Sequence, residues 1–149
     1  MHRFWRRYVA SAGGRETPAA RCETDSFGDT PELATALGKL VAKGRKTASC
    51  SCLWEWEAKG RPPPGVGERT IVVDGRGSPL CIIETTEVEI RAFAEVDERL
   101  AYDEGEDDRS LESWRRAHWA YFSRTLPRIG RQPSSDMPLV CERFRVVFV

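Results

Sequence analysis

Three segments with strand-type alternation constrain the fold of this chain more than any other feature. Residues 139–149 alternate with a period of two, which predicts a long final strand. Residues 69–74 and 80–90 predict two further strands, and the glycine-rich turn at 75–77 between them indicates a hairpin. Predicted helices are interspersed, and there are too few β-α-β repeats for a parallel sheet. We therefore expect one small curved or closed sheet with helices around it.

Helical periodicity and capping residues predict helices at residues 2–11, 31–43, 53–58, 96–104 and 110–127. Residues 47–52 are small and alternating, and they predict a fourth strand. Residues 12–30 show no period, so we expect a long connection there. Gly44 follows the second helix and is placed to stop it in a left-handed conformation.

Length and composition restrict the class of protein. A chain of 149 residues suits one domain, 1–149, with the helix at 2–11 docked on it. The longest apolar runs are four residues, far short of the roughly 20 that a membrane helix needs, so no membrane partner is expected. No signal-peptide pattern is found, which favours the cytoplasm. The five cysteines are then expected to be free thiols, and Cys50-x-Cys52 is too tight for a usual zinc motif.

The segment Gly44-Arg45-Lys46-Thr47-Ala48-Ser49 is the first candidate for chemistry. It places the ammonium group of Lys46 just past a helix end, and the hydroxyls of Thr47, Ser49 and Ser51 on one face of the following strand. An ammonium group beside hydroxyls can hold phosphate or activate a nucleophile. The glycines of a phosphate-binding P-loop are absent. A turn with an exposed lysine is the simpler alternative.

This segment resembles the Gly-x-Lys-x-x-Thr-x-Arg motif of the ASCH domain family, a relative of the PUA-like RNA-binding barrels. The resemblance covers about residues 2–149 and extends to Thr30-Pro31-Glu32, Ser51-Cys52-Leu53-Trp54-Glu55, residues 80–89, Tyr102-Asp103-Glu104-Gly105, Arg109-Ser110-Leu111-x-x-Trp114 and residues 137–144. It implies an α+β fold, namely a small PUA-like mixed β-barrel with flanking helices. It also implies that the partner is single-stranded RNA or a modified nucleoside.

The resemblance implies three activities. Some members resemble amidohydrolases that deacylate N4-acetylcytidine, some resemble ribonucleases, and others are non-catalytic RNA-binding modules. In the amidohydrolases the motif Lys and Thr act with a later Glu, which matches Lys46, Ser49 and Glu104 here. The motif Arg falls on Ser51, which removes a cation. The chain resembles the roughly 150-residue bacterial branch of the family, which is nearer the ribonuclease-like members, so we expect RNA hydrolysis ahead of deacylation. No cofactor is expected in general; only for a ribonuclease-like activity would a divalent cation such as Mn²⁺ be the candidate.

A second group of residues is expected to contact the substrate. It comprises Gly44, Arg45, Thr47, Ser51, Trp54, Trp56 and Tyr102. Trp54 and Trp56 follow the motif strand and are placed to flank a pocket, and Tyr102 and Tyr121 could supply hydroxyls. The other tryptophans on helical stripes, Trp5, Trp114 and Trp119, are expected in the core.

The acidic run that contains Glu104 and the helix that contains His118 each have a simple structural interpretation, whereas the charge state of Lys46 is open. The acidic run at 103–108 lacks the spacing of a calcium loop, so we expect a solvated surface and no metal site. His118 is expected to be a surface or hydrogen-bonded helix residue. For Lys46 to act as a base, burial must lower its pKa by roughly 3 units. If it stays charged, it stabilises an oxyanion or binds phosphate. If Lys46 is catalytic, Lys46→Ala is expected to lower turnover by at least about a hundredfold and to leave the melting temperature almost unchanged.

Overall fold

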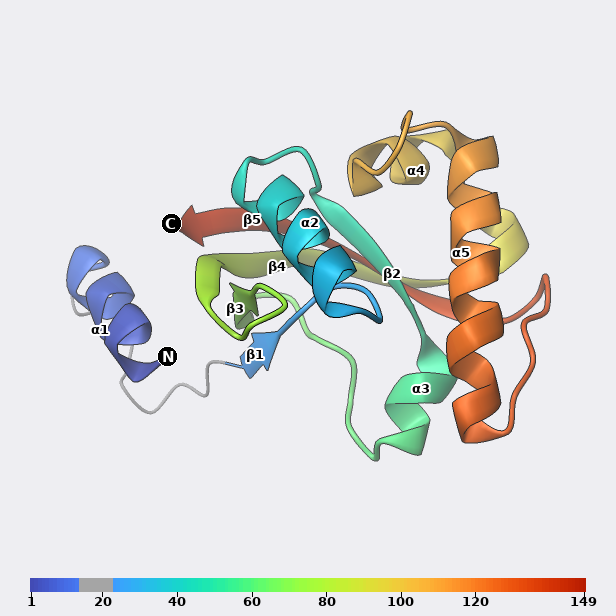
Figure 1. The fold of residues 1–149 in the computed structure, drawn as a ribbon, viewed down its shortest axis with the longest axis horizontal. Coiled ribbons are helices and arrows are strands. Elements are labelled where there is room, and N and C mark those ends of the chain that lie inside the picture. The colour runs from blue at the N-terminus through green and yellow to red at the C-terminus, as the bar shows by residue number, and fades with distance from the viewer. Residues whose placement is uncertain (14–22) are drawn as a thin grey trace.

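The computed structural model describes residues 1–13 and 23–149, which form a mixed α+β fold (Figure 1). The helices are α1 (His2–Ser11), α2 (Pro31–Ala42), α3 (Leu53–Ala58), α4 (Glu98–Glu104) and α5 (Leu111–Thr125), with short 3₁₀ helices η1 (Phe93–Glu95) and η2 (Leu126–Ile129). The strands are β1 (Glu23–Asp25), β2 (Ala48–Cys52), β3 (Arg69–Val73), β4 (Pro79–Ala92) and β5 (Pro138–Phe148). All the helices and strands expected from the sequence are therefore found.

Two differences concern the boundaries. The connection expected at 12–30 contains strand β1, which pairs in parallel with β3; residues 14–22, Cys22 among them, lie outside the described residues. Helix α4 begins at Glu98 rather than near Val96, because the side chain of Asp97 accepts a hydrogen bond from the Leu100 amide and caps it there.

The sheet has the strand order β1-β3-β4-β5-β2 and curls into a half-barrel. The predicted β3–β4 hairpin is confirmed, and every pair other than β1–β3 is antiparallel. The long strands β4 and β5 form the centre of the sheet. Their pairing shifts register at two places, near Ile82 and near Thr85. Such bulges increase local twist and bend a strand. They allow the two long strands to curve. Strand β2, which carries Ser49 and Ser51 of the candidate motif, lies at one edge of the sheet.

Helices cover the sheet at three places (Figure 1). Helix α2 starts at its Thr30 cap and packs Val41 into a cluster with Val72 and Phe144. Helices α4 and α5 bury residues such as Leu100 and Phe122 against β2 and β5.

At the other end of the sheet, α1 buries Trp5 and Tyr8 against Ile71 and Ile82. The phenol oxygen of Tyr8 accepts a hydrogen bond of 2.9 Å from Arg69. Of the tryptophans expected in the core, Trp5 and Trp114 are buried but Trp119 is 40% exposed. Trp119 on α5 makes an edge-to-face contact with Phe93, but its exposure shows that the expectation of a core position was wrong for this residue. No helix within the described ranges is long and apolar enough to cross a membrane.

Candidate active site

Lys46 is delivered into the interior by the end of α2. Gly44 adopts φ +77°, the left-handed conformation expected of it, and the chain turns so that the Lys46 amide still donates to Leu40. The side chain is only 2% exposed. Its Nζ donates three hydrogen bonds, to the Ala48 carbonyl at 2.9 Å, to Glu104 at 3.1 Å and to Glu106 at 3.0 Å. All three hydrogens of the ammonium group are therefore used, and the lysine is not an exposed turn residue.

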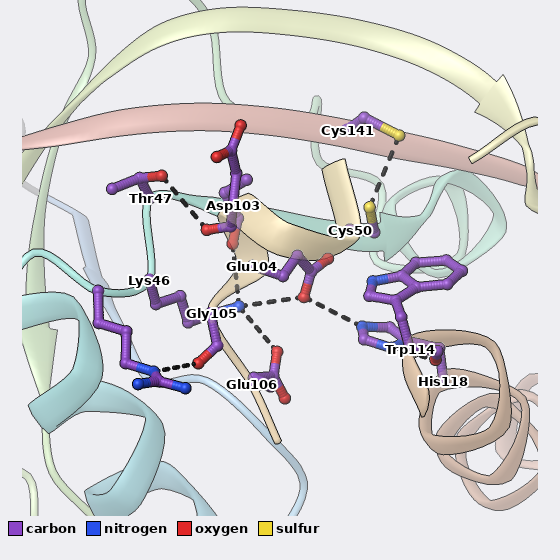
Figure 2. Close-up of polar contacts among 12 residues, drawn as sticks. Lys46, Thr47, Cys50, Asp103, Glu104, Gly105, Glu106, Trp114, His118 and Cys141 are labelled. Atoms are coloured by element: carbon purple, nitrogen blue, oxygen red, sulfur yellow. Dashed lines mark hydrogen bonds and ion pairs between the residues drawn. The ribbon is translucent and has the colours of Figure 1, made fainter. Parts of the chain in front are cut away.

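The two carboxylates are brought to Lys46 by the end of α4. Gly105 terminates this helix with φ +71°, and a Cβ there would lie 2.4 Å from the carbonyl oxygen of Arg45. The Arg45 guanidinium donates to the Gly105 carbonyl at 2.9 Å and so ties the loop to the motif segment. This close approach requires glycine. It places Glu104 and Glu106 on the same lysine (Figure 2).

His118 completes the group from α5. Its Nδ1 lies 2.9 Å from the carbonyl of Trp114, and its Nε2 lies 3.1 Å from Oε2 of Glu104. Both partners are acceptors, so both ring nitrogens must donate, which makes the ring an imidazolium. The ring also stacks on Trp114 with centroids 4.1 Å apart. We call Lys46, Glu104, Glu106 and His118 the charged cluster (Figure 2).

Burial and neighbouring charge act in opposite directions on the pKa values of the charged cluster. Burial alone would lower the pKa of Lys46 and of His118, but the carboxylates outweigh it, and both values are raised. Burial would raise the pKa of Glu104, yet Lys46 and His118 hold it well below its usual range. The pKa of Glu106 is raised by burial and by Glu104, against the effect of Lys46. The lysine is thus a fixed cation rather than the neutral base considered from the sequence.

One atom of the charged cluster is left without a partner. Oε2 of Glu104 binds both Lys46 and His118, whereas Oε1 is buried and has no hydrogen-bond partner among the described residues. A buried carboxylate oxygen without a donor is costly, and such groups in native proteins call for an explanation. Glu104 also interacts with the buried thiol of Cys50 on the core side of the charged cluster.

The charged cluster borders a cavity of about 1360 Å³, above the roughly 300–1000 Å³ typical of small-ligand pockets. Strand β2 lines it with Ser49 and Ser51, α3 with Trp56, α5 with Tyr121 and β5 with Glu142. Ser49 and Ser51 leave the strand on the same face, as the alternation predicts. The hydroxyl of Ser51 accepts a hydrogen bond from Trp56 at 2.8 Å. The Ser49 hydroxyl makes no hydrogen bond within the described part of the chain.

The structure separates the residues predicted to bind substrate. Ser51 and Trp56 line the cavity, whereas Gly44, Arg45, Thr47, Trp54 and Tyr102 do not. Each of the latter has another place: the Thr47 hydroxyl donates to the Asp103 carbonyl, the Trp54 ring lies under Arg131, and Tyr102 is exposed beneath Arg109. Gly44 and Arg45 shape the turn and the α4 loop.

Glu106 and His118 belong to the charged cluster but were not predicted as site residues from the sequence. Glu104 is 1% exposed and Glu106 is 24% exposed, so the acidic run at 103–108 is not a uniformly solvated surface. His118 is a buried partner of Glu104 rather than a surface residue. A signal was present, because His118 lies four residues after Trp114 on the buried stripe of its helix. A polar residue on such a stripe needs a polar partner.

The charged cluster also contains a set of metal-type ligands. Glu104, Glu106 and His118 offer one ligand atom each, all within 4.8 Å of one another. The Lys46 ammonium group, however, is bound to Oε2 of both carboxylates, and both nitrogens of His118 already face acceptors. A divalent cation would have to displace the lysine and deprotonate the histidine. The donor set therefore does not fit a resident metal ion in this arrangement, and the reaction proposed below uses none.

A mixed half-barrel with flanking helices is the architecture of a PUA-like domain. The sequence model of the ASCH domain matches residues 23–148. The crystal structure of an ASCH domain from Lactobacillus crispatus JV V101 is 35% identical, with a TM-score of 0.89, over 98% of this chain and 92% of that chain. The chain belongs to the ASCH domain family, whose PUA-like fold is in general RNA-binding.

A second solved structure supports the same assignment. A protein from Enterococcus faecalis V583 is 35% identical, with a TM-score of 0.87, over 97% of this chain and 86% of that chain. A search of the curated proteins found no match. The family and fold expected from the sequence are thereby confirmed.

Proposed function

We propose that this protein hydrolyses the amide bond of an N-acylated pyrimidine nucleoside such as N4-acetylcytidine. The observation that carries the proposal is the charge balance of the charged cluster, in which two cations face two carboxylates. Because no positive charge is left over, the charged cluster attracts a phosphodiester anion only weakly. A neutral amide can approach without that cost. The sequence favoured RNA hydrolysis, and the charge balance favours deacylation instead.

The arginines of the cavity wall support a neutral ligand. Three of them are already in ion pairs, namely Arg61 with Glu23, Arg69 with Glu84, and Arg124 with Asp29. An arginine engaged with a carboxylate has less charge to offer a phosphate group. Binding of a phosphate chain deep in the cavity would have to break these pairs.

The roles within the site follow from partners and pKa. In the proposed reaction, Ser49 Oγ bonds to the acyl carbon while its proton passes to the carboxylate of Glu106, whose raised pKa suits a base. Once Glu106 has taken up this proton it no longer neutralises Lys46, so the ammonium group can turn the hydrogen that it donated to Glu106 toward the oxyanion and stabilise it. The carbon–nitrogen bond then breaks, and the Glu106 proton goes to the amine of the released cytidine. Water hydrolyses the acyl-serine to acetate and regenerates the hydroxyl.

Glu104 and His118 act as positioning residues in this account. Glu104 binds both cations through Oε2, which fixes the ammonium group at the cavity, and His118 holds Glu104 from the far side.

One incubation separates the candidate functions. Purified protein is mixed with N4-acetylcytidine and, separately, with end-labelled single-stranded RNA, each in EDTA and in Mn²⁺. The proposal expects cytidine and acetate in both buffers, with the RNA intact. Shortened RNA beside unchanged N4-acetylcytidine would support ribonuclease activity instead. An RNA mobility shift with neither product would support a non-catalytic binding module, with a salt-dependent affinity.

A further inference from the structure

Glu142 on β5 is a cavity residue that the proposed reaction does not use. It is the register partner of Ser49 across the β2–β5 pair, so both side chains leave the sheet on the same face. Both line the same cavity. The hydroxyl of Thr85 on β4, a buried residue, donates to Oε2 of Glu142 at 3.2 Å. The carboxyl group is therefore held in one orientation, directly opposite the hydroxyl assigned to acyl transfer.

We propose that the carboxyl group of Glu142 is the site that binds the ring edge of a cytosine, through its N3 acceptor and its N4–H donor. The inference rests on the proposed function and names the group that orients the substrate's base beside Ser49. A carboxylic acid offers an O–H donor and a carbonyl acceptor side by side. These match the acceptor and donor of the cytosine edge, so two parallel hydrogen bonds can form.

The surroundings of Glu142 favour the neutral acid that this pairing needs. Within the described ranges it has no ion-pair partner, and the charged groups that act on it are Asp25 from β1, Glu68 before β3, and Lys46. Burial raises the pKa of Glu142 to about 7, with Asp25 and Glu68 adding to the effect and Thr85 and Lys46 opposing it. Around neutral pH much of the group therefore carries its proton.

The hydrogen bond from Thr85 determines which carboxyl oxygen of Glu142 accepts and which one carries the proton. Because Thr85 donates to Oε2, that oxygen is the acceptor and keeps a second lone pair for N4–H. The proton then resides on Oε1, which donates to N3. An ionised Glu142 would place a second lone pair against N3 and lose this bond. Phosphate is disfavoured at the same place by the neighbouring Asp25 and Glu68.

Calorimetric binding of cytidine, which has no acyl group to lose, tests the inference. Cytidine is compared with 3-deazacytidine, in which a C–H replaces N3, at pH 6 and pH 8.5. We expect the wild type to prefer cytidine by about tenfold at pH 6 and to lose most of this preference at pH 8.5, as one good hydrogen bond is lost. Glu142→Gln keeps a donor and an acceptor, so it should retain the preference at both pH values. Glu142→Ala should lose it.

The exposed Glu95 on η1, far from the cavity, supplies the control: Glu95→Gln should behave as wild type. Equal binding of the two nucleosides by the wild type, no binding of cytidine, or a preference that survives in Glu142→Ala would overturn the inference. If Glu142→Ala does not fold, the loss of pH dependence in Glu142→Gln remains the deciding comparison.

The experiments can contradict the binding site at Glu142 and the proposed hydrolysis independently of each other. Discrimination through Glu142 without any hydrolysis of N4-acetylcytidine would support this binding site and contradict the proposed reaction. Hydrolysis with an unchanged KM in Glu142→Ala would contradict the binding site alone. A hundredfold loss of kcat in Glu142→Gln, with cytidine binding unchanged and independent of N3, would make Glu142 a proton acceptor and overturn the inference.

Discussion

At the scale of single residues, the site consists of charges that the fold holds out of water. Lys46 and Glu104 are almost fully buried, and each depends on the other for its charge. Such pairs are weak contributors to net stability but are expensive to break. Their retention beside a cavity is therefore better explained by function than by folding.

Because Lys46 is buried, its removal should lower the free energy of unfolding. Lys46→Ala leaves Glu104 charged and buried without its main partner, so we expect the free energy of unfolding to fall by about 3–5 kcal/mol. The earlier expectation of an almost unchanged melting temperature is not compatible with this burial. Adding Glu104→Gln should recover part of the loss, since a neutral amide is cheaper to bury. Urea titrations of both variants measure it, and a single-variant loss below about 1 kcal/mol would speak against the buried pair.

Glu142 gives a stability effect that depends on pH. Its pKa is raised in the folded state, from 4.5 to about 7. The folded state therefore binds the proton more tightly, and stability is lost as the pH rises from about 4.5 through about 7. Glu142→Gln removes this loss, so it should stabilise the protein by up to about 3 kcal/mol at pH 8 and by much less at pH 5. Urea unfolding at the two pH values measures the difference; an equal effect at both would refute the shift.

At the scale of secondary-structure elements, the loop after α4 positions the carboxylates. Gly105→Ala should cost more than the roughly 1–2 kcal/mol of a left-handed non-glycine residue, because its Cβ would strike the Arg45 backbone. Gly130 has nearly the same φ, +72°, with nothing within 4 Å, and Gly130→Ala is the matched control. Thermal unfolding and turnover are measured for both. Equal effects of the two substitutions would show that the contact with Arg45 is unimportant.

Elements with strong local signals could be predicted, and contacts between distant elements could not. The Thr30 cap, the left-handed Gly44 and the alternation of β5 are all encoded in a few neighbouring residues. Strand β1 has three exposed polar residues and no pattern, so nothing local marks it. In the site, the motif pointed to Lys46 and Glu104. Glu106 and His118 join them only after α4 and α5 pack together.

At the scale of the whole molecule, we propose that α1 and the half-barrel form one cooperative domain. Trp5 is 6% exposed and packs with the sheet residues Ile71 and Ile82. Trp5→Ala should then lower the free energy of unfolding of the entire chain by about 3–5 kcal/mol. Circular dichroism and tryptophan fluorescence should report one shared transition. A fluorescence change at α1 with an unshifted transition of the sheet would contradict a single domain.

The most direct test of the central claim is the initial rate of cytidine release from N4-acetylcytidine by wild type, Ser49→Ala and Ser51→Ala. Both serines lie on the same strand face, but only the Ser51 hydroxyl is bonded to Trp56. We expect a loss of at least about a hundredfold in kcat for Ser49→Ala, with an unchanged melting temperature. Ser51→Ala should stay within about threefold of wild type. A wild type without activity, or a Ser49→Ala variant as fast as wild type, would contradict the proposed site.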